Sequence, residues 1–80
     1  MNPDDIEKII KDGLGDCKVE MQAEGNKLML LIVSHAFEGL NRVKRQQVVY
    51  GILNDLIASG EIHAVSMRTL TPGEASDHSA

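Results

Sequence analysis

The stretch SHAFEGLNRVKRQQVVYGILNDLIASGEIHAVSM, residues 34–67, decides how this chain of 80 residues folds. It predicts a turn, then a long helix, then a strand. In the second half of the helix, the apolar residues recur at the spacing of one side of an α-helix: Val49, Ile52, Leu53, Leu56 and Ile57. That side must face a hydrophobic core.

Capping residues predict where this helix begins and ends. Asn41 supplies a side-chain acceptor for the free backbone N–H groups of the first turn. Gly60 tolerates the left-handed conformation that often follows the last turn. Residues 62–67 are then predicted to form a strand, with His63 near its N-terminal end.

Shorter segments precede this stretch. Asn2 followed by Pro3 predicts the start of a first helix, and Gly13 and Gly15 are expected to stop it. Residues 18–22 alternate polar and apolar like a half-exposed edge strand, whereas residues 28–33 are all apolar like a central strand. The polar segment between these two strands predicts a hairpin.

The predicted order is helix, strand, strand, helix, strand, in an α+β domain. A right-handed crossover through the long helix makes the third strand parallel to the second. The start of the third strand, with His63, is therefore expected beside the hairpin loop, and the basic start of the long helix at the far end of the sheet. The loop is formed by Glu24, Gly25, Asn26 and Lys27.

The C-terminal segment carries a further helix signal. Thr71, Pro72 and Glu74 have the spacing of a capping box with proline at the first helical position. We therefore expect one domain over residues 1–74, in which a short last helix begins at this point. A disordered tail is expected over residues 75–80, which include no apolar residue larger than alanine to dock it.

Composition limits the functions that such a small domain can have. Hydrophobic residues make up 42% and charged residues 25%, but one Phe and one Tyr offer few rings for stacking nucleic-acid bases. The net charge of -4 disfavours non-specific binding of a polyanion. The single cysteine excludes an internal disulfide, which suits a reducing compartment. Neither a signal peptide nor a membrane-spanning run is visible, so we expect a cytoplasmic protein.

The sequence shows none of the usual arrangements for catalysis. No activated nucleophile, pair of catalytic carboxylates or phosphate-cradling glycine loop is visible. The one well-placed histidine needs a partner to complete a site. We therefore expect a binding module and not an enzyme.

Several motifs together resemble the BolA family. They are Ser34-His-Ala-Phe-Glu-Gly39, Arg42-Val-Lys-Arg-Gln-Gln-Val-Val-Tyr50, Ile62-His-Ala-Val-Ser66 and Thr69-Leu-Thr-Pro72. The Arg-Gln-Gln helix with Val49-Tyr-Gly51 is most similar to the IbaG branch. The resemblance implies an αββαβ domain like a class II KH domain, with a three-stranded mixed sheet and helices packed on one face.

The resemblance also implies a partner and a cofactor. BolA proteins are expected to pair with a monothiol glutaredoxin around a bridging 2Fe-2S cluster. A cysteine and glutathione ligate it from the glutaredoxin side, and histidine from the BolA side. The C-terminal histidine of the family corresponds to His63 in this chain. The implied role is that of an adaptor in iron-sulfur cluster assembly and trafficking, or in iron sensing.

The second ligand of the family is usually a Cys or His in the loop between the first two strands. In this chain that loop contains neither, and Lys27 stands where related sequences carry His. Lysine is a poor iron ligand, because its amine holds its proton until about pH 10.4. We also expect a backbone group or a nearby carboxylate, Glu61 or Glu24, to orient the second nitrogen of the His63 ring.

The other histidines and the cysteine have simpler interpretations. His35 follows the central strand and is expected in a turn at the opposite end of the sheet from His63, and His78 falls in the tail with no expected role. Cys17, just before the first predicted strand, is interpreted as a small, half-buried thiol. Cys17, water, a residue of the partner or no group at all are the alternatives for the second cluster ligand.

Two other functions are compatible with the sequence. Arg42, Lys44 and Arg45 form the basic cluster of the chain, so the alternative is a transcription regulator that binds DNA through them. These residues equally fit a solvated helix end whose Arg stems cover the region of Phe37. A third hypothesis is an apo homodimer in which a second copy covers the apolar second strand.

Overall fold

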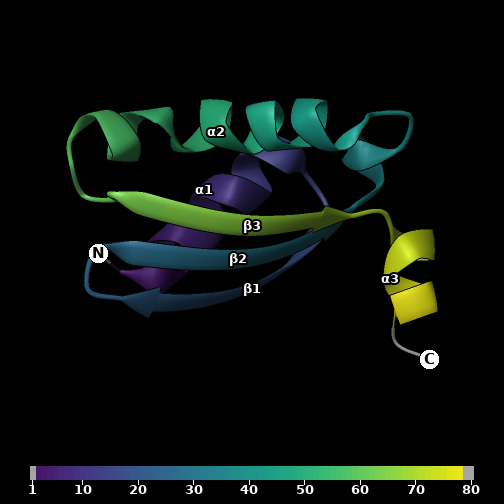
Figure 1. The fold of residues 1–80 in the computed structure, drawn as a ribbon, viewed down its shortest axis with the longest axis horizontal. Helices are drawn as coiled ribbons and strands as arrows, with labels where there is room; N and C mark the ends of the chain where they lie inside the picture. The colour runs from purple at the N-terminus through teal and green to yellow at the C-terminus, as the bar shows by residue number, and fades with distance from the viewer. Residues whose placement is uncertain (1, 79–80) are drawn as a thin grey trace.

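The computed structural model describes residues 2–78 of the chain, and the side chains of residues 2–76. Over these residues the elements are α1 (Pro3–Leu14), β1 (Cys17–Glu24), β2 (Lys27–Ser34), a short 3-10 helix η1 (His35–Phe37), α2 (Arg42–Ala58), β3 (Ala64–Leu70) and α3 (Pro72–His78). Figure 1 shows α1 and α2 beside the sheet and α3 at the end where β3 finishes. The predicted α+β order is confirmed.

The sheet has the strand order β1-β2-β3. β1 and β2 pair antiparallel, with Glu24 opposite Lys27 at the turn, whereas β2 and β3 pair in parallel, with Lys27 opposite Ala64. The mixed sheet expected from the crossover is therefore confirmed. Parallel pairing also brings His63, directly before β3, to the end of the sheet that holds the β1–β2 turn.

Helix ends follow the predicted capping residues. Asn2 Oδ1 accepts the backbone N–H two residues further on, and Asn41 Oδ1 accepts the N–H three residues further on, both at 2.9 Å. Gly60 adopts a left-handed φ of 83° just after α2. Gly13 does not stop α1, however. It lies within the helix, where a Cβ atom would come 2.8 Å from the side chain of Ile52 on α2.

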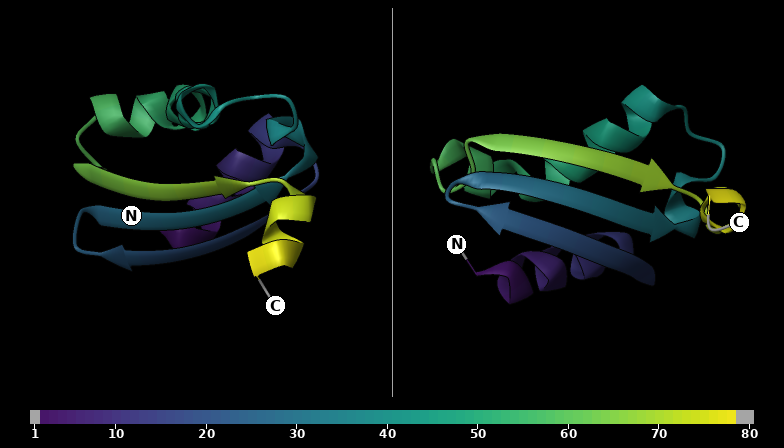
Figure 2. Two further views of the ribbon diagram at one scale, coloured as in Figure 1. Left: turned by 45° about the vertical axis from the view of Figure 1, so that its right-hand side comes forward. Right: turned by 60° about the horizontal axis from the view of Figure 1, so that its bottom comes forward.

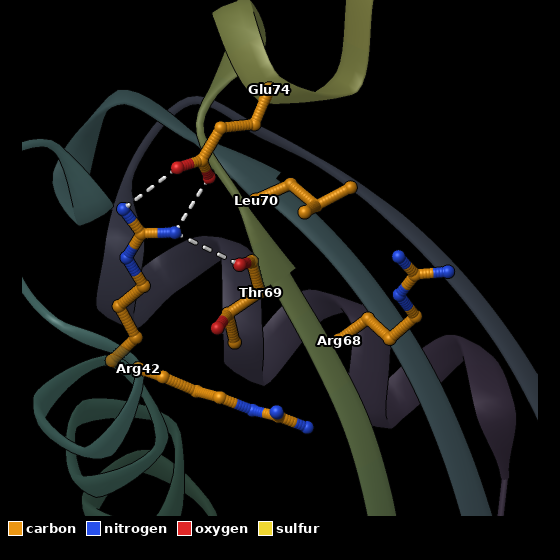
Figure 3. A pocket seen from close by; sticks show the side chains of 6 residues that line it. Arg42, Arg68, Thr69, Leu70 and Glu74 are labelled. Atoms are coloured by element: carbon orange, nitrogen blue, oxygen red, sulfur yellow. Dashed lines mark hydrogen bonds and ion pairs between the residues drawn. The ribbon is translucent and has the colours of Figure 1, made fainter. Parts of the chain in front are cut away.

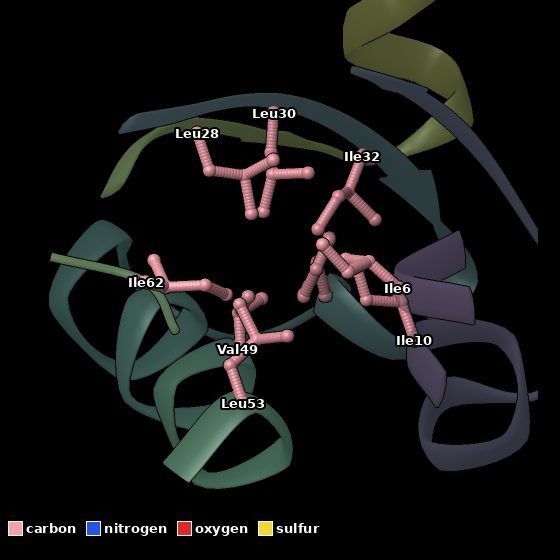
Figure 4. Packing of buried hydrophobic residues seen from close by; sticks show 9 residues of the cluster. Ile6, Ile10, Leu28, Leu30, Ile32, Val49, Leu53 and Ile62 are labelled. Carbon is pink, nitrogen blue, oxygen red and sulfur yellow. The ribbon is translucent and has the colours of Figure 1, made fainter. Parts of the chain in front are cut away.

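One cluster, aliphatic except for Phe37, forms the core between the sheet and the two long helices. Figure 4 shows the strands on one side of this cluster and α1 and α2 on the other. Its members, all buried, are Ile6, Ile10, Leu28, Leu30, Ile32, Phe37, Val49, Leu53 and Ile62. Alternate residues of β2 thus pack against Val49 and Leu53, on the side of α2 predicted to be apolar, and this packing holds α2 on the sheet. The prediction is wrong for Ile57, which is 37% exposed.

Strand limits differ from the sequence-based prediction. β3 begins at Ala64 and not at residue 62, because the N–H groups of Glu61 and Ile62 both bond to the carbonyl of Leu56, at 3.1 and 3.3 Å. These two residues therefore complete the end of α2. β1 and β2 are longer than expected, which leaves Gly25 and Asn26 as a two-residue turn.

The outer face of the sheet is only partly covered. Met29, Leu31 and Val33 of β2 point to this face, and Ala75 of α3 lines the same hollow as Leu31 and Val33. Figure 2 shows α3 at this end of the sheet from two further directions. No helix of the described part of the chain is long and apolar enough to cross a bilayer.

The C-terminal segment differs from the expected disordered tail. The capping box forms, since Thr71 N–H donates to Glu74 Oε1 at 2.9 Å and Glu74 N–H donates to Thr71 Oγ1 at 3.3 Å. The resulting helix α3 includes residues 75–78, which were predicted to be disordered. Residues 79–80 of the predicted tail lie outside the described residues.

Candidate functional site

The β1–β2 turn meets the residue that precedes β3. The backbone N–H of His63 donates to the carbonyl oxygen of Asn26 at 3.0 Å, and Nδ1 of the His63 ring lies 2.8 Å from Nδ2 of Asn26. Both residues are exposed. The predicted position of His63 beside the hairpin loop is therefore confirmed, and a main-chain and a side-chain contact hold it there.

Two neighbours of His63 in the chain fix its position. Ile62 is 1% exposed and anchors the segment in the core, so the next residue emerges at the surface. Gly60, with its left-handed φ, passes close to the ring, because a Cβ atom placed there would lie 3.5 Å from Nε2 of His63. The ring is thus held at Nδ1 by Asn26, and its Nε2 faces a glycine without a side chain.

The tautomer of His63 depends on which atom of the Asn26 amide faces Nδ1. When the Asn26 amide donates to Nδ1, the neutral ring carries its proton on Nε2. When the amide is rotated by 180°, its oxygen accepts from a protonated Nδ1, and Nε2 then offers a lone pair. Asn26 can therefore support His63 either as a donor or as a ligand through Nε2.

The rest of the predicted loop surrounds this contact. Gly25 takes a positive φ of 61°, as the first residue of a two-residue turn requires, and Glu24 and Lys27 pair across the ends of the two strands. The prediction that Glu24 or Glu61 orients His63 is wrong, because the amide of Asn26 fills that role. Sequence spacing could place the loop near His63 but could not select the side chain.

The donor set of this site fits one ligand position of a metal centre. Among the residues that the structure describes, no group of three or more His, Cys, Asp or Glu side chains is placed to hold a metal ion. The exposed imidazole of His63 offers one nitrogen, and neutral imidazole suits iron. The other ligands of such a centre must then come from another molecule.

Cys17 is too far away to be the second ligand. It is the first residue of β1 and pairs with Ser34, at the end of the hairpin opposite to the turn, and eight strand residues span more than about 20 Å. That alternative is therefore excluded. Partial burial also raises the pKa of the Cys17 thiol, which lowers its reactivity as a thiolate.

The remaining histidines also lie away from His63. His35 is in η1, at the far end of β2 as predicted, and its Nδ1 lies 3.0 Å from Oε1 of Glu38. Both partners are well exposed, which is typical of a surface contact. The side chain of His78, for which no role was predicted, lies outside the described residues.

Arg45 has a structural role that the sequence did not reveal. Its guanidinium donates to the carbonyls of Leu40 (2.8 Å) and Thr69 (3.1 Å) and to both carboxylate oxygens of Glu74, at 2.6 and 3.3 Å. Figure 3 shows the bonds to Thr69 and Glu74, which join the start of α2 to the end of β3 and to α3. Only 13% of the Arg45 side chain is exposed. The hydrogen bond from Arg45 lowers the pKa of Glu74 to about 2.

The predicted basic cluster is therefore not one surface. Arg42 lines a hollow of about 380 Å³ together with the engaged Arg45 and with Arg68 of β3. Lys44 follows Arg42 by two residues, and residues two apart do not share a helix face. The capping box pointed to Glu74, but no local signal in the sequence linked it to an arginine 29 residues earlier.

Comparison with known proteins gives a consistent result over nearly the whole chain. The family model described as BolA-like protein matches residues 8–74. A protein from the rpoN-murA intergenic region of Acinetobacter guillouiae is 43% identical over 92% of this chain and 89% of its own length. Acid stress protein IbaG of Escherichia coli K12 is 36% identical over 92% of this chain and 88% of its own length. A solved BolA homologue from Coxiella burnetii superimposes with a TM-score of 0.83 at 30% identity, covering 95% of this chain and 97% of its own.

Proposed function

Because this chain belongs to the BolA family, we propose that it is an adaptor that docks on a monothiol glutaredoxin and shares a bridging 2Fe-2S cluster with it. His63 supplies the ligand from this chain, and a glutaredoxin cysteine and glutathione supply the others. The shared cluster is the cargo in iron-sulfur cluster assembly and trafficking, or the signal in iron sensing. The chain then acts by binding and not by catalysis.

The observation that carries this proposal is the way His63 is presented. Its ring is exposed at the end of the sheet, held at Nδ1 by Asn26, with Nε2 beside Gly60. In the ligand tautomer Nδ1–H donates a hydrogen bond to Oδ1 of the rotated Asn26 amide, and metal-binding histidines are usually oriented by such a bond from their other ring nitrogen. A structural histidine in a core would instead be buried.

DNA binding has less support from the same structure. Arg45 already makes four hydrogen bonds within the chain, and Arg42 and Lys44 point to different sides of α2. Non-specific DNA binding draws its free energy from several phosphates neutralised together. On a chain of net charge -4, these two exposed cations form a weak phosphate-binding surface.

The test is reconstitution of the complex. The purified protein is mixed with a monothiol glutaredoxin, glutathione, iron and sulfide, and the visible absorption and circular dichroism are compared with those of the glutaredoxin alone. We expect a new spectrum from a one-to-one complex. The absence of both complex and new spectrum would contradict the proposal.

A matched pair of variants assigns the ligand. His63→Ala removes the exposed imidazole beside the turn, whereas His35→Ala removes an exposed imidazole at the other end of the sheet. We expect His63→Ala to change or abolish the new spectrum while the far-ultraviolet dichroism of the apo protein is unchanged. His35→Ala should behave like the unmodified protein. An unchanged spectrum for His63→Ala would remove His63 from the cluster.

A further inference from the structure

A basic hollow lies where the start of α2 meets the end of β3. Its volume is about 380 Å³, and we call it the arginine hollow. Three arginines and a single glutamate line it, on a chain whose net charge is -4. The full lining is Arg42, Arg45, Arg68, Thr69, Leu70 and Glu74. The hollow is therefore a local concentration of positive charge on an acidic protein.

The carboxylate in this lining is already bound within the chain. Glu74 accepts two hydrogen bonds from Arg45, at 2.6 and 3.3 Å, and a third from the N–H of Thr71 at 2.9 Å. The hydrogen bond from Arg45 is the main reason why the pKa of Glu74 falls to about 2, so this carboxylate is ionised at neutral pH. Glu74 thus balances the charge of Arg45 and leaves that of Arg42 without a counterpart in the lining.

Arg42 is the arginine that is free to meet a ligand. Its side chain is exposed and makes no hydrogen bond or ion pair with any residue that the structure describes. A guanidinium group is a planar fork of N–H donors that matches two oxygens of a phosphate or carboxylate group. Arg42 is also the first residue of α2, where the helix dipole adds partial positive charge.

Arg68 brings a second positive charge to the arginine hollow from another element. β3 is an edge strand of the sheet, and Figure 3 shows Arg42 and Arg68 on its two sides. Arg42 comes from α2, beside the edge of β3, whereas Arg68 belongs to β3 itself. Two arginines that approach from different directions can contact different oxygens of one anion.

We propose that the arginine hollow binds a small molecule that carries a phosphate monoester, whose oxygens contact Arg42 and Arg68. At neutral pH a phosphate monoester carries nearly two negative charges on three terminal oxygens, so it can satisfy two arginines. A carboxylate carries one charge on two oxygens. The volume of the hollow suits a small ligand, and Leu70 offers an apolar contact to the rest of it.

A phosphate held in one hollow differs from the phosphates of DNA. Duplex DNA presents rows of singly charged phosphodiesters, and its binding requires several cations spread over one surface. Lys44 is exposed at the start of α2 but does not line the arginine hollow. A change of Lys44 should therefore weaken DNA binding but not binding in the hollow.

The arginine hollow is also separate from the site at His63. β3 runs from Ala64, next to His63, to Leu70, which lines the hollow. Seven strand residues span about 20 Å, so the two sites lie at opposite ends of the sheet. A ligand in the hollow therefore does not compete with a cluster at His63, and its binding can be tested without the glutaredoxin.

Titration of the ¹⁵N-labelled protein with phenyl phosphate, followed by NMR at neutral pH and constant ionic strength, tests this proposal. We expect saturable shifts of the amide signals of Arg42, Thr69 and Leu70, with a Kd of about 1 mM. The signals of Asn26 and His63 should not move. Benzoate, which presents the same ring with one carboxylate, should bind about tenfold more weakly, because it lacks one charge-assisted contact.

A matched set of variants assigns the contacts. Arg42→Gln removes the fork and its charge and should weaken the binding of phenyl phosphate about tenfold, and Arg68→Gln should weaken it by a similar factor. Lys44→Gln removes an equal charge two residues along α2 and should change the Kd by less than about twofold, because solvent and salt screen that charge. Arg42→Lys keeps the charge but not the fork and should recover part of the affinity.

Three results would overturn the proposal. The first is the absence of saturable shifts at the arginine hollow up to about 20 mM phenyl phosphate. The second is equal weakening by Arg42→Gln and Lys44→Gln, which would indicate diffuse attraction of anions. The third is tighter binding of a short DNA duplex that depends equally on Arg42 and Lys44, which would assign these cations to DNA. Far-ultraviolet dichroism checks that every variant folds.

Discussion

The contact between Asn26 and His63 combines two kinds of hydrogen bond on one residue pair. The backbone bond from His63 N–H to the Asn26 carbonyl positions the main chain at the start of β3. The side-chain bond at Nδ1 orients the ring. A change of the Asn26 side chain therefore removes only the second bond, so positioning and orientation can be separated experimentally.

Replacing Asn26 with Ala should destabilise the shared cluster without unfolding the protein. The ring of His63 loses the partner that orients it, and loss of such partners typically lowers metal affinity by about 10- to 100-fold. We expect the visible circular dichroism of the reconstituted complex to decay faster in the presence of a chelator. Lys27→Ala, which alters the next residue of the same loop, should decay like the unmodified complex. Equal decay of all three complexes would deny Asn26 this role.

Two helical glycines should respond in opposite ways to the same substitution. Gly51 of α2 is exposed and nothing lies within 4 Å of a Cβ atom there, whereas a Cβ atom at Gly13 would meet the side chain of Ile52 at 2.8 Å. Gly51→Ala should raise the free energy of unfolding of the monomer by about 0.5–1 kcal/mol, because alanine restricts the unfolded chain. Gly13→Ala should lower it, because α1 and α2 must separate or Ile52 must shift.

Urea titrations at low protein concentration measure both effects. The opposite signs are the informative result, since helix propensity alone predicts stabilisation by both substitutions. A gain in stability from Gly13→Ala would mean that the packing of α1 on α2 is looser than the structure shows.

At the scale of elements, Arg45 connects three parts of the chain that are distant in sequence. Its guanidinium joins the loop before α2, the end of β3 and the first turn of α3. The same carboxylate of Glu74 accepts the N–H of Thr71 and so caps α3. The attachment of α3 to the domain therefore depends on a single, mostly buried arginine and its ion pair.

The contribution of Glu74 to stability should depend on pH. Its pKa is about 2 in the folded chain against an ordinary value of 4.5, so the folded state favours the ionised carboxylate. The stabilisation is fully present above pH 4.5 and is lost as the pH falls toward 2. Glu74→Gln, which keeps a side-chain acceptor for Thr71 but removes the charge, should be less stable than the unmodified protein at pH 7.

Urea titrations of both proteins between pH 7 and pH 2 test this expectation. The difference in their free energies of unfolding should shrink below pH 4.5 and approach zero near pH 2. A difference that stays constant over this range would show that the charge of Glu74 does not stabilise α3.

For the whole molecule, local signals predicted the elements, and long-range contacts explain what was missed. Asn2, Asn41 and the Thr71 capping box act on neighbours within three residues, so they could be recognised from sequence. Handedness of the crossover placed His63 near the turn. Asn26 is 37 residues away in sequence from its partner His63, and Glu74 is 29 residues away from its partner Arg45. Only packing brings each pair together.

The family is shown over residues 8–74 and the fold over nearly the whole chain, and the central claim is that His63 ligates a cluster shared with a monothiol glutaredoxin. The most direct measurement is pulsed electron paramagnetic resonance of the reduced cluster in the reconstituted complex. Only the histidines of this chain are labelled with ¹⁵N. We predict a ¹⁵N hyperfine coupling from a directly bound imidazole that disappears in His63→Ala and persists in His35→Ala. A cluster spectrum without ¹⁵N coupling, or one that is unaffected in His63→Ala, would contradict the account.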